Sequence, residues 1–60
     1  MLTFEEKTIV NNFMVAIKRA NMDTEISFVK ATRERGFLKV TVCRNGTEDW
    51  YHVLKDGTWY

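Results

Sequence analysis

Two dipeptides, Asn45-Gly46 and Asp56-Gly57, constrain the fold of this chain more than any other feature. Each lies between segments in which apolar and polar residues alternate. Asn-Gly and Asp-Gly accept the positive φ angles that a two-residue type I′ hairpin loop requires. The second half of the chain therefore predicts an antiparallel meander, with strands over residues 37–44, 47–55 and 58–60.

The first third of the chain has the pattern of an amphipathic helix over residues 4–20. Thr3 and Glu6 form a T-x-x-E capping box, in which each side chain accepts a hydrogen bond from the other residue's backbone amide. Acids in the first turn and bases in the last match the helix dipole, and Asn21 can end the helix in a left-handed conformation. Apolar residues recur at helical spacing along one stripe: Val10, Phe13, Met14, Ile17 and Ala20.

The segment over residues 25–33 mixes β-branched and aromatic residues with polar ones, which predicts a first strand. Its facing depends on the loop that follows. A three-residue loop puts Ile26 and Phe28 on the aliphatic face of the meander, and a two-residue loop puts Val29 and Ala31 there. We favour the three-residue loop because it buries the larger side chains.

The register through both turns divides the predicted sheet into two faces. The first turn sets Thr41 opposite Trp50, and a two-residue second turn sets Leu54 opposite Trp59, so the two tryptophans share a face. The helix can cover only one side, and the aliphatic side matches its stripe. We expect that core side to carry Leu38, Val40, Val42, Tyr51 and Val53, joined by Ile26 and Phe28.

The opposite side is the candidate binding face, because no second helix is predicted to cover it. A contiguous aromatic patch on an uncovered surface usually marks an interaction site. The alternative is that the rings pair across strands only to stabilise a small sheet. The residues expected on this face are Phe37, Lys39, Thr41, Trp50, His52, Leu54 and Trp59.

Length, composition and the element pattern together indicate a single α+β domain over residues 1–60, with one N-terminal helix packed on a three- to four-stranded antiparallel meander. Sixty residues is near the size at which one hydrophobic core suffices.

The lone cysteine, Cys43, excludes an internal disulfide and suits a reducing compartment. The N-terminal residues lack a long apolar segment after a basic start, so we expect no secretory signal, no membrane association and a cytoplasmic location.

Catalysis is not expected from this sequence. Cys43 and His52 fall on one face, but the predicted register separates them by four residues, about 13 Å, which is too far for a nucleophile and its base. No second His or Cys gives metal-ligand spacing, and no glycine pattern suits a phosphate. We therefore predict no catalytic residue, no metal and no cofactor.

These features favour a non-catalytic protein-binding module that uses the aromatic face, as a regulator or inhibitor acting by occlusion or through homodimerisation. The partner would be another protein or a second copy of the chain. Nucleic-acid binding by the same face, with lysine and arginine beside the tryptophans, is the alternative. A net charge of +1 argues against it, since phosphate contacts dominate such affinity.

Overall fold

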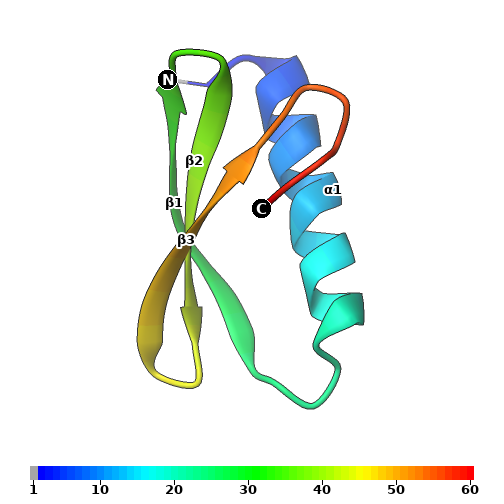
Figure 1. Ribbon diagram of the computed structural model, residues 1–60, viewed down its shortest axis with the longest axis vertical. Helices are drawn as coiled ribbons and strands as arrows, with labels where there is room; N and C mark the ends of the chain where they lie inside the picture. The colour runs from blue at the N-terminus through cyan, green and yellow to red at the C-terminus, as the bar shows by residue number, and fades with distance from the viewer. Residues whose placement is uncertain (1) are drawn as a thin grey trace.

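One helix packs against one face of a three-stranded antiparallel sheet in the computed structural model, which describes residues 2–60 (Figure 1). The strand order is β1-β2-β3, so each strand pairs with its neighbour in sequence. The predicted α+β class is confirmed. The elements are α1 (Phe4–Ala20), β1 (Ile26–Glu34), β2 (Phe37–Arg44) and β3 (Thr47–Val53).

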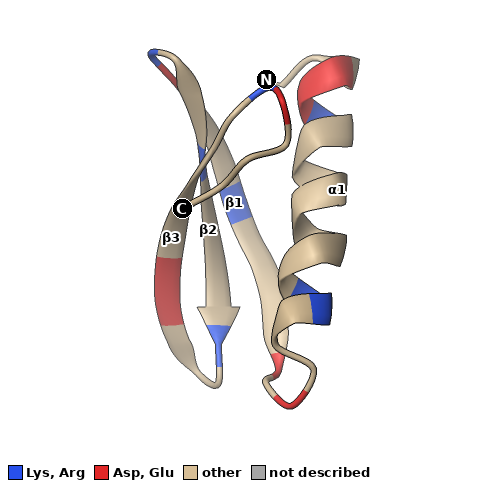
Figure 2. Cartoon of the chain, turned by 45° about the vertical axis from the view of Figure 1, so that its right-hand side comes forward, with Lys and Arg blue, Asp and Glu red and all other residues tan. Residues whose placement is uncertain are grey.

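The helix begins as its capping box predicts. The Thr3 amide donates to Glu6 Oε1 at 2.8 Å, and the Glu6 amide donates to Thr3 Oγ1 at 3.1 Å. Acidic residues lie in the first turn of α1 and basic residues in the last, as Figure 2 shows. Asn21 ends the helix differently from the prediction, because it is not left-handed (φ −130°). Its side-chain amide instead donates to the Ile17 carbonyl at 2.9 Å, which satisfies a helix-end acceptor.

The core is a single apolar layer between α1 and the sheet. Ile17 on the helix and Val40, Val42 and Val53 on the sheet are essentially inaccessible to solvent. Burying one such side chain stabilises the fold by about 1.5–3 kcal/mol. The remaining buried apolar residues are Val10, Phe13, Met14, Ile26 and Leu38.

The turn between β2 and β3 confirms the prediction made from the Asn45-Gly46 dipeptide. Asn45 and Gly46 both have positive φ, 51° and 84°, as a type I′ loop requires. The pairing of β2 with β3 then follows the predicted register through Thr41 opposite Trp50 and Lys39 opposite His52. The aliphatic residues of β2 accordingly face α1.

The first strand combines the two alternatives that its sequence left open. The connection to β2 has two residues, because Glu34 pairs with Phe37, so the predicted three-residue loop is wrong. Ala31 therefore lies opposite Val40, as the two-residue alternative requires.

A β-bulge that precedes Ala31 in β1 changes the facing of the residues at the start of the strand. One extra residue between Phe28 and Lys30 shifts the register, so Phe28 lies opposite Val42. Ile26 is consequently buried in the core, while Phe28 stays half exposed. The facing that we favoured for these two residues is thus correct, but a bulge produces it and the loop does not.

The second turn differs from the prediction by one residue. Gly57 has φ 92°, and its amide donates to the Leu54 carbonyl at 3.0 Å. The Leu54 amide donates to the Thr58 carbonyl at 2.8 Å, so three residues form the loop. Strand β3 ends at Val53 rather than at residue 55, and residues 58–60 contribute a single bridge in place of a strand.

This one-residue difference reverses the facing of the last residues. Trp59 pairs with Val53 and so lies on the helix side of the sheet. Its ring packs edge-on against Phe13, with centroids 5.5 Å apart, and against Tyr51 at 5.8 Å. The prediction that Trp59 shares a face with Trp50 is therefore wrong, because a one-residue slip moves side chains to the opposite face.

Replacing Trp59 by alanine is expected to destabilise the domain by about 2 kcal/mol, because the ring packs against Phe13 and Tyr51 at the core. The matched substitution Trp50→Ala should cost below about 1 kcal/mol, since that ring lies on the uncovered face. Urea denaturation followed by circular dichroism measures both. Equal losses for the two variants would contradict this assignment of faces.

Candidate functional site

The outer face is the side of the sheet turned away from α1, and the structure places most of the predicted site residues there. The register puts Phe37, Lys39, Thr41, Trp50 and His52 on it. Within residues 2–60 no second helix covers this face, as Figures 1 and 2 illustrate. Leu54 lies in the turn after β3 and is half-buried, and Trp59 belongs to the core side.

Four rings on the outer face form what we call the outer aromatic cluster: Phe37, Trp50, His52 and Tyr60. His52 is at its centre, with centroid distances of 4.3 Å to Phe37 and 4.9 Å to Trp50. The Tyr60 ring stacks on His52 at 4.7 Å, with only 5° between the planes. The imidazole is thus held by three neighbours from β2, β3 and the C-terminal segment.

Tyr60 is the residue that sequence reasoning missed. The His52 amide donates to the Tyr60 carbonyl at 2.9 Å, and the Tyr60 amide returns a bond to the His52 carbonyl at 3.0 Å. These bonds place Tyr60 beside His52 along the edge of β3. Asp-Gly is also typical of three-residue loops that end in a left-handed glycine, and that reading would have found Tyr60.

A lysine lies against the exposed tryptophan. Lys39 Nζ is 4.8 Å from the centroid of the Trp50 ring, within cation–π range. Trp50 remains 49% exposed, whereas Thr41 beside it is 6% exposed. At the centre of the outer face, the Thr41 side chain is therefore buried, and the Trp50 ring beside it is half exposed to solvent.

The charges of the outer face have a simple order along the strands. Lys30 pairs with Thr41 and Lys39 pairs with Thr32, so both lysines lie near the middle of the sheet. Glu34 lies at the end where β1 turns into β2, and Glu48 lies at the opposite end, beside the turn into β3. Two lysines are thus bracketed by two acids.

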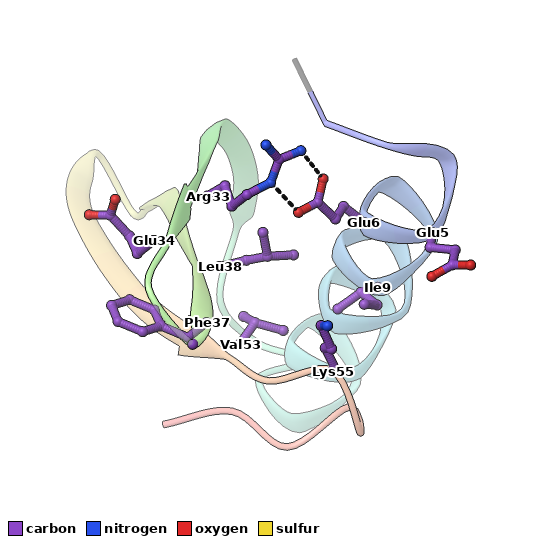
Figure 3. A pocket seen from close by; sticks show the side chains of 10 residues that line it. Glu5, Glu6, Ile9, Arg33, Glu34, Phe37, Leu38, Val53 and Lys55 are labelled. Atoms are coloured by element: carbon purple, nitrogen blue, oxygen red, sulfur yellow. Dashed lines mark hydrogen bonds and ion pairs between the residues drawn. The ribbon is translucent and has the colours of Figure 1, made fainter.

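A cleft of about 670 Å³ opens at one end of the two layers, between the start of α1 and the sheet (Figure 3). Leu38, Val53 and Ile9 give it an apolar floor. Its lining also contains three acids and two bases: Glu5, Glu6, Glu34, Arg33 and Lys55. Such mixed charge indicates no particular ligand.

One ion pair closes a wall of this cleft and ties the helix to the sheet. Arg33 Nε donates to Glu6 Oε2, and Arg33 Nη2 donates to Glu6 Oε1, both at 2.6 Å, as Figure 3 shows. The same carboxylate accepts the Thr3 amide of the capping box. These hydrogen bonds, those from Arg33 above all, lower the pKa of Glu6 from 4.5 to about 2.

The structure keeps Cys43 and His52 apart, as the predicted register did. Cys43 pairs with Glu48, and His52 lies four residues farther along β3. In the part of the chain that the structure describes, no three His, Cys, Asp or Glu side chains gather as a metal-binding group. Nor does any helix there have the length and apolar character needed to cross a membrane.

Comparison of this chain with protein-family models, with curated proteins and with solved structures finds no match. A proposal about function therefore depends on the surfaces described above.

Acid is expected to weaken the fold through Glu6. Because the folded pKa is below the unfolded value of 4.5, the native state binds fewer protons, and the stabilisation is complete above that value. It is lost as the pH falls from about 5 toward 2. Urea midpoints for the parent and Glu6→Gln should differ at pH 7 and converge near pH 2.

The matched control is Glu5→Gln, because the Glu5 side chain makes no hydrogen bond or ion pair among the described residues. Its difference from the parent should be small at neutral pH. A difference for Glu6→Gln that stays constant from pH 7 to pH 2 would refute the role of this carboxylate.

Proposed function

We propose that this chain is a non-catalytic protein-binding module that contacts its partner through the outer face. The observation that carries the proposal is the exposure of Trp50, a member of the outer aromatic cluster, on the side of the sheet that α1 leaves uncovered. Tryptophan and tyrosine are the residues that most often dominate binding energy at protein interfaces. Lys39, whose ammonium lies against the Trp50 ring, supplies a polar contact beside that apolar surface.

Order within the cluster supports this proposal on energetic grounds. Binding costs about 0.5–1.5 kcal/mol for each mobile side chain that must be fixed. The rings of Phe37 and Tyr60 already contact His52, and Lys39 already lies over Trp50. A partner would therefore meet a surface that loses little conformational freedom on association.

The proposal extends to how the module acts. A small domain with an exposed contact face and separated Cys43 and His52 side chains suits a regulator or inhibitor that occludes part of a larger protein. The single cysteine is consistent with work in the reducing cytoplasm. A second copy of the chain is the other partner that this face could accept.

Nucleic acid is the second candidate partner, because Lys30 and Lys39 lie near the exposed Trp50 ring. Single-strand binders combine such cations with stacking rings. Glu34 and Glu48 oppose this use, since they lie at both ends of the same face and would repel a phosphate backbone running along the strands.

The proposal is tested by affinity capture from lysate of the source cells, with nuclease-treated and untreated samples compared. The parent should retain a defined protein, and Trp50→Ser should reduce that retention at least about tenfold, as loss of a central interface aromatic does. Val15→Ser is the matched control, because Val15 is a 51% exposed apolar residue on α1.

Circular dichroism must first establish that all three proteins are folded. Equal retention by the parent and Trp50→Ser would refute the proposal. Retention that disappears after nuclease treatment would favour the nucleic-acid alternative.

A further inference from the structure

We infer that the outer face recognises a short acidic segment of a partner protein, with one carboxylate between Lys30 and Lys39 and an adjacent apolar side chain on Trp50. This inference deepens the proposed function and rests on it. It specifies the chemistry of the partner, which the aromatic cluster alone leaves open.

The placement of the two lysines is the first argument. Lys30 pairs with Thr41 on β2, and Lys39 lies two residues before Thr41 on that strand, so the lysines are diagonal neighbours on one face. Diagonal positions on paired strands are about 7–8 Å apart, within reach of long side chains. Two ammonium groups can therefore converge on a single carboxylate.

The second argument is that neither lysine is neutralised within the domain. Among residues 2–60, the two ion pairs join Arg33 to Glu6 and Arg44 to Asp49. Neither Lys30 nor Lys39 lies within salt-bridge distance of an acid in that part of the chain. An incoming carboxylate would consequently meet no internal acid that competes for either lysine, although Lys39 also contacts the Trp50 ring.

The third argument concerns what lies next to the lysines. In the row formed by Lys30, Thr41 and Trp50, the middle side chain is buried and the ring beside it is half exposed. An apolar side chain next to the bound carboxylate would cover this ring and gain contact with its apolar surface. The pattern that fits is one or two acids flanking an apolar or aromatic residue.

Glu34 and Glu48, at the two ends of the outer face, limit how long an anionic ligand can be before it meets a carboxylate. Glu34 and Glu48 lie toward opposite ends of the strands, with the lysines between them. A long polyanion lying along the strands would meet a carboxylate at each end, whereas a peptide can carry its acids only at the centre. This arrangement favours an acidic peptide over a nucleic acid.

The test is a nuclear magnetic resonance titration of the full chain with a blocked heptapeptide, Gly-Ser-Glu-Phe-Asp-Ser-Gly. The expected result is a saturable shift of the Trp50 indole N–H and of backbone amides in β2 and β3. The neutral peptide with Gln and Asn in place of Glu and Asp should bind roughly fivefold more weakly, as exposed ion pairs allow. A hexathymidylate serves as the nucleic-acid probe.

Two variants separate charge from folding. Lys30→Glu reverses one charge without touching the Lys39–Trp50 contact, and it should remove the preference for the acidic peptide over the neutral one. Lys18→Glu makes the same change on α1 and should leave that preference intact. Dispersed amide spectra establish that each variant is folded.

Equal binding of the acidic and neutral peptides, or an unchanged preference in Lys30→Glu, would overturn the inference. Tighter binding of hexathymidylate than of the acidic peptide would overturn it in favour of nucleic acid. Failure of the acidic peptide to bind, while capture of a protein still depends on Trp50, would overturn this inference and leave the proposed function standing.

Discussion

Coverage of one face of the sheet by one helix is the constraint on which the rest of this structure depends. In 60 residues, α1 supplies a single apolar stripe, and that stripe packs in one core with Val40, Val42 and Val53 of the sheet. The other face must then be stabilised by contacts among its own side chains. The stacking of rings around His52 is the result, since cross-strand aromatic contacts stabilise a sheet by roughly 0.2–1 kcal/mol each.

The end of the chain shows how strongly a turn decides which residues belong to which face. Moving the loop by one residue exchanges Trp59 and Tyr60 between the core side and the outer face. Trp59, the larger ring, then fills space beside Phe13, where burial of apolar area is worth most. Tyr60 keeps its hydroxyl on the wetter side, which avoids burying a polar group without a partner.

Sequence reasoning succeeded where one local rule determines the geometry. The Thr3–Glu6 capping box and the Asn45-Gly46 loop each have one favoured backbone arrangement, so the start of the helix and the β2–β3 register could be predicted. It failed at the Gly57 loop, where Asp-Gly is compatible with two loop lengths.

The bulge near Lys30 could not be predicted, because no local signal marks it. It arises from a tertiary conflict: the two-residue connection brings Ala31 to the core side, while the buried position of Ile26 requires the opposite alternation. One extra residue between the two satisfies both requirements. The outer-face positions of the β2 and β3 residues could thus be predicted from the Asn45-Gly46 turn, whereas that of Tyr60 could not, because it depends on the length of the Gly57 loop.

On the outer face, the residues that stabilise the sheet differ from the residue to which we propose a binding role. His52 and Phe37 are half-buried and contact each other, so their main role is to hold the sheet surface together. Trp50 contacts His52 and Lys39, yet keeps half of its surface in solvent. A ring needed only for stability would gain more by lying flat among its neighbours, so its exposure supports a role in contacting a partner.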